Sequence, residues 1–370
     1  MTTELKYVPV LKWKQGEQKA VEGLQIPTKQ SMTPLIEIPQ IDWDYENDCP
    51  KKTIDEHLSK TGESLYNSWG ITEPVFIDLI YIDPSERMQD GSHPLSYVLQ
   101  EGRNRGINLI PVTDPNRDSA YQLEVMKANQ TDQNGVCIRL KEAHFNNLQH
   151  HINQLLQQQN ISPNEVDLVI DYEYASTENK NRTSIFLKGV LDTIPYLHDW
   201  RSLTLTGTSF PADLGSIDSN SIGEIERSEW LIWKDVVTTH SLKRSLNFGD
   251  YGISNPAPFE ADPRFINMSA NIRYTADDKY IIFKGRVIKR FGGAQYFQIA
   301  QQVVAHHEYY GAGFSAGDYY INEVANNNDG PGNATSWRKA GTNHHLTLVI
   351  TELSNWISPS TSSSLHPVTP

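Results

Sequence analysis

Val136-Cys-Ile-Arg-Leu140 and Asp167-Leu-Val-Ile-Asp171 are two short apolar runs that decide the fold class of this 370-residue chain. Both are rich in β-branched or large apolar residues and are bounded by polar or turn-forming residues. Such runs are typical of strands that are buried on both faces of a parallel sheet. Similar runs recur at a spacing of roughly 30 residues, which suits a repeated β/α unit. The others are Tyr7-Val-Pro-Val-Leu11, Pro34-Leu-Ile-Glu-Ile38, Val75-Phe-Ile-Asp-Leu-Ile80, Asn108-Leu-Ile-Pro-Val112, Ser202-Leu-Thr-Leu-Thr206 and Ser245-Leu-Asn-Phe248.

Segments with helical periodicity lie between these runs, for example at residues 145–159, 184–197 and 222–239. Alternating strands and helices leave two architectures open, a closed barrel and an open doubly wound sheet. The residues after the first run, Lys12-Trp-Lys-Gln-Gly-Glu17, lack the glycine fingerprint of dinucleotide-binding open sheets. Eight near-equal units also suit closure. We therefore predict an α/β fold, a (β/α)8 TIM-like barrel.

The strand–helix rhythm ends near residue 261, which predicts a C-terminal α+β extension. Asn271-Ile-Arg-Tyr-Thr275 and Tyr280-Ile-Ile-Phe-Lys284 flank a turn and predict a hairpin. A helix is expected at 293–309, a glycine- and asparagine-rich segment at 311–332, and a last helix at 337–356. The predicted domains are thus a barrel at 1–260, an extension packed on it at 261–357, and a disordered tail at 358–370.

Composition and charge narrow the class of protein. Hydrophobic residues make up 38% and charged residues 21%, which is ordinary for a globular chain. No apolar stretch is long enough to span a membrane, and no signal-peptide core follows the first residue, so we expect a cytoplasmic protein. The two cysteines, Cys49 and Cys137, form no zinc or redox motif. A net charge of −13 argues against a broad nucleic-acid surface.

Several blocks of the chain resemble the "beta protein" family of bacteria and T4-like bacteriophages. The resemblance extends from Tyr7 to about Trp356. It implies no established activity and no catalytic residues, but it suggests phage–host conflict as the setting. The blocks are Val8-Pro-Val-Leu-Lys-Trp-Lys-Gln-Gly-Glu-Gln-Lys-Ala20, Phe248-Gly-Asp-Tyr-Gly252, Arg273-Tyr-Thr275, Phe314-Ser-Ala-Gly-Asp318, Gly332-Asn-Ala-Thr-Ser-Trp-Arg338 and Gly341-Thr-Asn-His-His345.

Carboxylates at the ends of the predicted strands are the candidate catalytic residues, because barrel active sites lie at the carboxyl ends of the strands. They are Glu37, Asp78, Asp171 and Glu173. Such groups suit a Mg²⁺ ion and metal-assisted phosphoryl or phosphodiester hydrolysis. The alternative is a structural network with nearby cations. Asp171 and Glu173 share one face if the strand continues through both, which would raise one pKa. In that enzyme, Asp171→Asn would abolish turnover and leave folding intact.

Cations and aromatic residues near the same mouth are the candidate ligand-binding residues. Arginine forks match phosphate groups, so the cations suit an anionic ligand, although a solvated surface position is the alternative for each. The glycine-rich segment at 311–332 is a candidate lid, or simply a cover for one edge of the barrel. The candidates are Lys12, Lys14, Arg139, Asp250, Tyr251, Arg273, Arg338 and His345.

Two classes of function remain open from the sequence. The first is an enzyme that binds, and hydrolyses, an anionic phosphorylated or nucleotide-like ligand at the carboxyl-terminal mouth; the fold favours this class. The second is a non-catalytic sensor or protein-interaction module of a defence or phage system. Its partner would be the same kind of anion or a phage or host protein. No membrane partner is expected.

Overall fold

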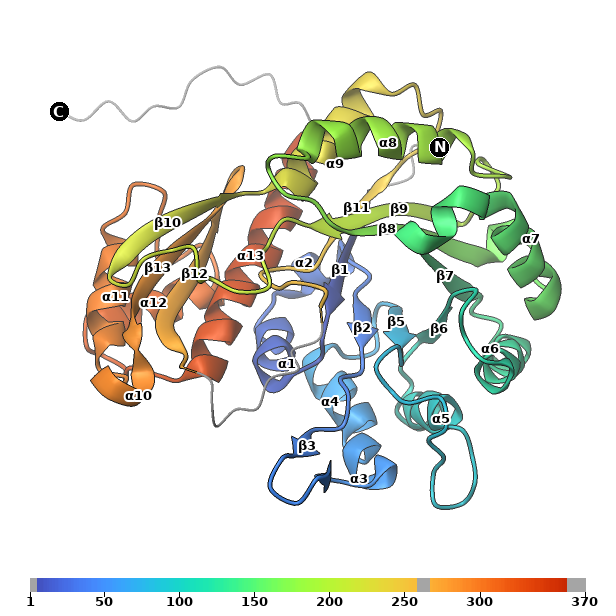
Figure 1. Ribbon diagram of the computed structural model, residues 1–370, viewed down its shortest axis with the longest axis horizontal. Coiled ribbons are helices and arrows are strands. Elements are labelled where there is room, and N and C mark those ends of the chain that lie inside the picture. The colour runs from blue at the N-terminus through green and yellow to red at the C-terminus, as the bar shows by residue number, and fades with distance from the viewer. Residues whose placement is uncertain (1–4, 258–266, 358–370) are drawn as a thin grey trace.

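Eight parallel strands close into a barrel in the computed structural model of the chain, which describes residues 5–257 and 267–357 (Figure 1). The strands are hydrogen-bonded in the order β1, β11, β9, β8, β7, β6, β5, β2 and back to β1. Their bounds are β1 Tyr7–Leu11, β2 Leu35–Glu37, β5 Val75–Asp78, β6 Leu109–Thr113, β7 Val136–Lys141, β8 Val166–Tyr174, β9 Ser202–Thr208 and β11 Asn247–Asp250. The predicted (β/α)8 barrel is confirmed, and each predicted run overlaps one of these strands.

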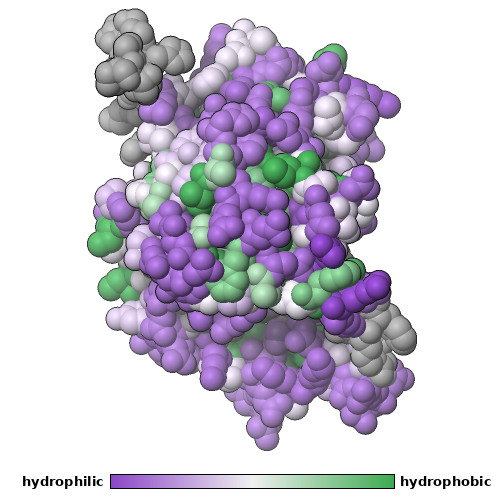
Figure 2. Space-filling model, turned by 90° about the vertical axis from the view of Figure 1, so that its left-hand side faces the viewer, coloured by the Kyte–Doolittle hydropathy of each residue, from purple (hydrophilic) through white to green (hydrophobic). Residues whose placement is uncertain are grey.

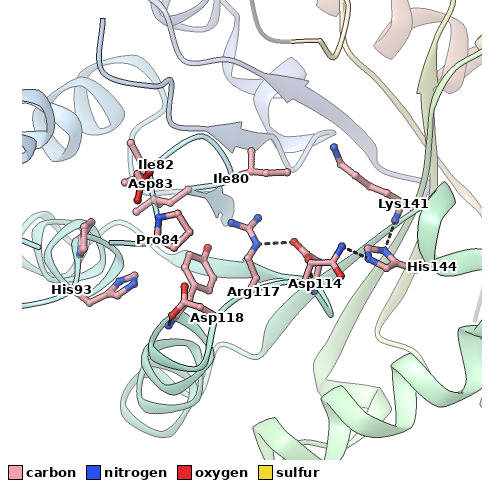
Figure 3. A pocket seen from close by; sticks show the side chains of 14 residues that line it. Ile80, Ile82, Asp83, Pro84, His93, Asp114, Arg117, Asp118, Lys141 and His144 are labelled. Carbon is pink, nitrogen blue, oxygen red and sulfur yellow. Dashed lines mark hydrogen bonds and ion pairs between the residues drawn. The ribbon is translucent and has the colours of Figure 1, made fainter. Parts of the chain in front are cut away.

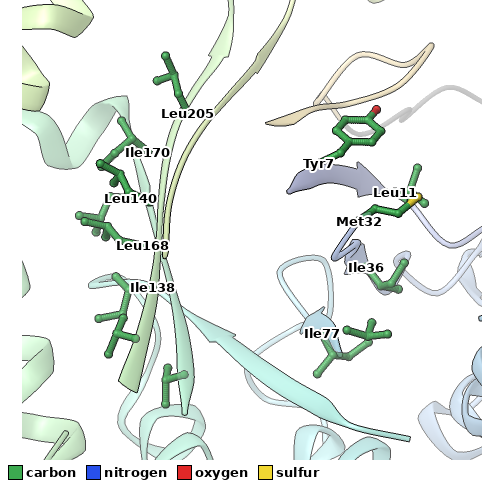
Figure 4. Close-up of a cluster of buried hydrophobic side chains, with 14 of the residues drawn as sticks. Tyr7, Leu11, Met32, Ile36, Ile77, Ile138, Leu140, Leu168, Ile170 and Leu205 are labelled. Atoms are coloured by element: carbon green, nitrogen blue, oxygen red, sulfur yellow. The ribbon is translucent and has the colours of Figure 1, made fainter. Parts of the chain in front are cut away.

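Side chains along each strand point alternately into the barrel interior and toward the outer layer of helices. Ile138 and Leu140 of β7 and Ile170 of β8 point away from the barrel axis and pack in the main apolar core under the helices (Figure 4). The alternate residues point inward, where Cys137 and Val169 belong to a smaller apolar cluster. The next inward positions after these are charged, so the interior changes from apolar to polar toward its carboxyl-terminal mouth.

Helices cover the outside of the barrel, as the strand–helix rhythm predicts. The predicted helix at 145–159 is a 3-10 helix at Glu142–Asn147 followed by α7, and the one at 184–197 begins and ends earlier, as α8. A second short 3-10 turn, Pro163–Glu165, precedes β8. The helices of the barrel are α1 Gln15–Glu22, α2 Ile26–Gln30, α3 Ile54–Leu58, α4 Thr61–Ser68, α5 Pro94–Arg105, α6 Ser119–Asp132, α7 Leu148–Gln159, α8 Lys180–Asp192 and α9 Ser228–Thr239.

The long interval between β2 and β5 contains a small antiparallel ribbon, β3 (Trp43–Asp44) and β4 (Cys49–Pro50). The ribbon precedes α3, whose first turn is closed by a capping box between Thr53 and Glu56.

The extension begins with the predicted hairpin, β12 (Ser269–Ala276) and β13 (Lys279–Val287). A third strand, β10 (Ser221–Glu226), pairs with the free edge of β13 and completes the sheet. The prediction of one helix over 222–239 was therefore wrong in its first part. The chain leaves the barrel after β9, adds β10 to the extension, and returns as α9. The proposed boundary near residue 260 is thus crossed by one strand.

Three further helices and a long final one pack around this sheet: α10 (Ile288–Phe291), α11 (Gln295–Val304), α12 (Ala316–Ala325) and α13 (Ala334–Ile357). The segment at 311–332 is not a loop throughout, because α12 lies inside it. Helix α13 lies between barrel and extension and contacts both α1 and β12 (Figure 1). Gly341 permits this approach, since a Cβ there would lie 2.7 Å from the carbonyl oxygen of Arg273. The predicted tail at 358–370 lies outside the described residues.

The face that the extension presents is mostly hydrophilic, with small scattered hydrophobic areas (Figure 2). No helix in the described part of the chain is long and apolar enough to cross a membrane.

Candidate functional site

The carboxyl ends of four strands bring Glu37, Asp78, Arg139 and Asp171 together in the mouth of the barrel. Each of these residues occupies an inward-facing position of its strand, and all four side chains are buried. Arg139 lies at the centre. Its Nη1 donates to Glu37 Oε1 at 2.8 Å and to Asp78 Oδ2 at 3.0 Å, and its Nε donates to Asp171 Oδ2 at 2.9 Å. These residues thus lie together at one mouth, where the sequence-based expectation put them.

Tyr251, which follows β11, completes the contacts of Arg139. Its hydroxyl accepts from Arg139 Nη2 at 2.7 Å and donates to Asp171 Oδ2 at 2.6 Å. Burial alone would lower the pKa of Arg139, but Tyr251 and the surrounding carboxylates raise it well above its ordinary value. The guanidinium thus holds the position between the carboxylates where a metal ion would bind. Among residues 5–257 and 267–357, no three His, Cys, Asp or Glu side chains are arranged to hold a metal.

Arg117 extends the same network and was not among the residues singled out from the sequence. Its Nη2 donates to the second oxygen of Asp78 at 2.5 Å, and its Nε donates to Asp114 at 2.6 Å. Burial disfavours its charge, yet Asp78 raises its pKa above the ordinary value. Asp114 directly follows β6, and Arg117 lies three residues later. A carboxylate and an arginine at this spacing after a strand end are the sequence signal that could have identified this pair.

Glu37 keeps one oxygen outside this network. Oε2 is buried and accepts no hydrogen bond from any described residue. Burial raises the pKa of Glu37, and Asp78 adds to the effect while Arg139 opposes it. Of the three carboxylates that contact Arg139, Glu37 is therefore the one with an oxygen outside the network and a tendency to hold a proton. Its neighbour Tyr81 is near enough to hydrogen-bond to it, and Glu17 on α1 also has a buried unpartnered oxygen and a raised pKa.

Lys12 and Tyr81 lie beside Glu37. Lys12 Nζ donates to the carbonyl oxygens of Pro256 at 3.0 Å and Ala257 at 2.7 Å, and the Tyr81 hydroxyl donates to Pro256 at 2.9 Å. Burial lowers the pKa of Lys12, which Glu37 partly offsets, and burial together with Glu37 raises the pKa of Tyr81. Tyr81 was not foreseen, because it lies in the loop after β5 and not at the strand end.

Asp171 and Glu173 do not enter one pocket. The pairing of β8 shifts register after Asp171, and Glu173 has a φ of +60°, which reverses the alternation of side chains. Glu173 is 40% exposed and forms an ion pair with Lys141 at 2.7 Å. Its backbone N–H donates to Asp171 Oδ1 at 2.9 Å. The bulge therefore directs Asp171 into the mouth and Glu173 toward solvent.

Asp250 and His345 are buried outside the barrel interior, between β1, β11, β12 and α13. His345 Nε2 lies 2.9 Å from Asp250 Oδ2, and Tyr7 donates to Asp250 Oδ1 at 2.5 Å. Burial would raise the pKa of Asp250, but His345 and these hydrogen bonds lower it. His345 Nδ1 lies 3.0 Å from the hydroxyl of Thr275, which is also buried. The arrangement resembles a hydroxyl–histidine–aspartate triad, yet it joins elements, and none of its residues lines either of the two cavities described below.

The preceding histidine, His344, contacts a different carboxylate. Its Nδ1 lies 2.8 Å from Asp318 Oδ2 and its Nε2 lies 2.7 Å from the carbonyl oxygen of Thr275. Both ring nitrogens of His344 thus lie within hydrogen-bonding distance of an oxygen, one on α12 and one on β12. The consecutive histidines therefore bind α13 to its neighbours on two sides.

Arg273 and Arg338 meet at a cavity of about 400 Å³ between the barrel and the extension. Arg273 Nη1 donates to the carbonyl oxygen of Ile253 at 2.7 Å, and Arg338 Nη1 donates to the same oxygen at 3.0 Å. Arg338 also donates to the Ser254 hydroxyl at 2.7 Å. Burial and the neighbouring Arg338 lower the pKa of Arg273 well below its ordinary value. No carboxylate among the described residues forms an ion pair with either arginine. Burial lowers the pKa of Arg338, and the nearby carboxylate of Glu17 partly offsets this effect.

A second hollow of about 300 Å³ lies on the rim beside β5, β6 and β7 (Figure 3). Arg117 and Lys141 line it together with Asp114, His93 and His144. The Nδ1 atoms of both histidines accept backbone hydrogen bonds, from Leu95 N and Lys141 N respectively. Its arginine and lysine are already paired with carboxylates, so this rim hollow has less unsatisfied charge than the arginine cavity.

Lys14 stands apart from all these groups. Its side chain is exposed at the start of α1 and has no hydrogen bond or ion pair to the mouth carboxylates among the described residues. The structure thus divides the predicted anion-binding cations into three groups: Arg139 inside a carboxylate cluster, Lys12 beside Glu37, and the pair Arg273 and Arg338 at the cavity.

Comparison with known proteins identifies one family. A model of the family described as Beta protein matches residues 7–351, which include both the barrel and the extension. No curated protein matches the chain.

Proposed function

The chain belongs to the Beta protein family, and on that premise we propose that it binds a small anionic ligand, bearing phosphate or a comparable group, in the cavity where Arg273 and Arg338 meet. Membership of the family assigns no reaction by itself. The single observation that carries the proposal is the convergence of two half-buried arginines on one carbonyl oxygen, with no carboxylate of the described residues in an ion pair with either.

Electrostatics makes this pair costly without a ligand. Two like charges close together repel one another, and partial burial removes some of the water that would solvate them. Elsewhere in this protein, buried arginines are compensated: Arg139 has three carboxylates, and Arg227 has Glu352 at 3.0 Å. An anion with two negative charges would supply at the cavity the compensating negative charge that Glu and Asp side chains supply at those sites.

The remaining walls of the cavity suit an organic phosphate. Tyr296 and Trp337 stack at 4.9 Å between ring centroids and form an aromatic wall, and Asn271 adds a polar group. Lys284 adds a third positive charge, against the one carboxylate of Asp213. The cavity is thus positively charged in a chain whose net charge is −13, and its volume of about 400 Å³ lies in the range of small-molecule sites.

Thermal unfolding against inorganic phosphate, nucleotides and phosphorylated metabolites, with and without Mg²⁺, tests the proposal. A ligand at about 100 times its Kd should raise the free energy of unfolding by roughly 2.7 kcal/mol. Arg273→Gln and Arg338→Gln should each weaken binding by about 10-fold or more, because each removes a charged fork. Arg182→Gln is the matched control, since Arg182 is exposed on α8 and its loss removes the same charge far from the cavity.

The variants also separate loss of binding from loss of folding. Without ligand, Arg273→Gln should stay within about 1 kcal/mol of the wild-type stability, because relief of repulsion offsets the lost hydrogen bond. A flat ligand panel, or equal ligand-induced shifts in all three variants, would refute the anion site and favour a protein partner.

Hydrolysis of the bound ligand is a second candidate function, favoured by the free Oε2 of Glu37. A proton-holding carboxyl group at a barrel mouth suits general acid chemistry. Glu37→Gln should then abolish turnover of a ligand that still binds at the arginines; retained turnover would leave only binding. The setting we propose is phage–host conflict in the cytoplasm, which the resemblance to genes of T4-like phages and bacterial defence neighbourhoods suggests and which inspection of neighbouring genes tests.

A further inference from the structure

We propose that an anion bound by Arg273 and Arg338 releases the cap segment, residues 252–257, from the mouth of the barrel and uncovers Glu37. The inference rests on the proposed function and adds regulation to it: the ligand cavity and the barrel mouth are coupled through one short segment.

The cap segment is held mainly by side chains, although Ser254 N donates to the Tyr251 carbonyl oxygen at 3.1 Å and the Ile253 side chain is buried in an apolar cluster. Three cations bind its carbonyl oxygens: Arg273 and Arg338 bind that of Ile253, and Lys12 binds those of Pro256 and Ala257. Neutral side chains bind two more of its carbonyl oxygens, Tyr280 donating to Gly252 at 3.2 Å and Thr208 to Ser254 at 3.4 Å, and Tyr81 shares that of Pro256 with Lys12 at 2.9 Å.

An anion competes directly with this arrangement. The two guanidinium groups converge at the Ile253 carbonyl oxygen, so that oxygen occupies the point where one anion would receive hydrogen bonds from both arginines. A hydrogen bond between ionised partners is about twice as strong as one to a neutral acceptor. The anion therefore displaces Ile253, and the hydroxyl of Ser254 loses its donor, Arg338, at the same time.

Displacement at Ile253 reaches the mouth because the segment is short. Pro256 lies three residues further on, and its carbonyl oxygen joins the cap segment to Lys12 and Tyr81 beside Glu37. Gly252, with a φ of +58°, supplies a pivot at the start of the segment. Burial lowers the pKa of Lys12, and the charges of Glu37 and Arg338 also act on it, so this side chain is near enough to both sites to respond to each.

Acetylation of Lys12 measures the release. Lys12 is partly buried under the cap segment, whereas Lys14, two residues away on the same peptide, is exposed. Inorganic phosphate, at a concentration that saturates the thermal shift, should raise the acetylation rate of Lys12 relative to Lys14 by about threefold or more. A nearby anion by itself would favour protonated Lys12 and slow the reaction, so a faster reaction reports uncovering.

A conservative variant tests whether a more weakly held cap segment strengthens phosphate binding. Tyr81→Phe removes one bond to the cap segment without touching the arginines, and should tighten phosphate binding by a few-fold, because a looser cap competes less. Tyr319→Phe, at an exposed tyrosine of α12, is the control and should change neither affinity nor acetylation.

The outcomes distinguish the two proposals. Phosphate that stabilises the wild type but changes neither the Lys12 to Lys14 ratio nor the affinity of Tyr81→Phe would overturn the coupling and leave the anion site standing. Absence of any phosphate- or ligand-induced stabilisation would overturn both. A raised ratio together with tighter binding by Tyr81→Phe supports the coupled cap.

Discussion

Arg139 lies at the carboxyl-terminal mouth of the barrel, where barrel proteins hold their ligands, and its guanidinium group contacts three carboxylates and the Tyr251 hydroxyl. Glu37, Asp78 and Asp171 surround it within 3.0 Å. Three buried carboxylates around one cation leave an excess of negative charge. Arg117 offsets part of this excess as a second cation. The cluster is therefore a structural network whose members depend on one another, and catalysis, if Glu37 performs it, uses the one oxygen left over.

Removal of Arg139 should reveal this dependence. Arg139→Met should lower the free energy of unfolding at neutral pH by about 3–5 kcal/mol, because it leaves buried carboxylates without their cation. Urea denaturation measures the change, and Arg182→Met, at an exposed site, should stay within about 0.5 kcal/mol of the wild type. Equal stability of the two variants would show that the mouth carboxylates do not need Arg139.

At the same scale, strand periodicity predicted part of the site. Alternation and the carboxyl-end rule identified Glu37, Asp78, Arg139 and Asp171, because both follow from local sequence. The rule did not say that Arg139 would neutralise the others, since that requires the closed barrel. The sequence analysis also predicted that Asp171→Asn would leave folding intact. Because Asp171 accepts hydrogen bonds from Arg139, Tyr251 and Glu173, we now expect this substitution to lower the stability.

Helix α13 is the element on which the arrangement of barrel and extension depends. Leu346 and Val349 belong to the main core of the barrel, while Trp337 and Ala340 belong to that of the extension. Near its end, Glu352 forms an ion pair with Arg227, the residue before α9. Burial raises the pKa of Glu352 to about 7 and outweighs the attraction of Arg227.

The raised pKa predicts a pH dependence of stability. The folded state holds a proton on Glu352 between its unfolded pKa of 4.5 and about 7, so the free energy of unfolding should fall as pH rises through that window and level off above it. The expected fall is on the order of 3 kcal/mol. In Glu352→Gln this contribution should be absent, and urea denaturation from about pH 5 to pH 8 should give a flatter curve. Parallel curves would contradict the assignment.

Two elements were missed for different reasons, β10 because its local pattern is that of a helix, and α12 because its signal was concealed. Ser221–Glu226 contains Ile222 and Ile225, whose spacing of three is that of a helix, and only pairing with the distant β13 makes it a strand. Helix α12 did carry a signal: the hydroxyl of Ser315 accepts from the backbone N–H of Asp318, the capping pattern of a helix start. The glycines around it concealed that pattern.

The whole molecule behaves, we expect, as one cooperative unit despite its two sheets. A fragment of residues 1–260 lacks the α13 side chains of the barrel core and the partner of β10. It should therefore fail to unfold cooperatively, while the full chain should show one transition by both circular dichroism and tryptophan fluorescence. A fragment that unfolds with the midpoint of the full chain would establish the barrel as independent.

Strand β10 has a consequence for how the chain is made. During synthesis, Ser221–Glu226 emerges from the ribosome more than fifty residues before Lys279–Val287, the only strand it pairs with in the described sheet. At the slower end of elongation rates, synthesis of the residues between the two strands takes on the order of ten seconds. For that time β10 has unpaired N–H and C=O groups along both edges. Its three charged or polar positions, Ser221, Glu224 and Glu226, are then a safeguard against pairing with a neighbouring nascent chain.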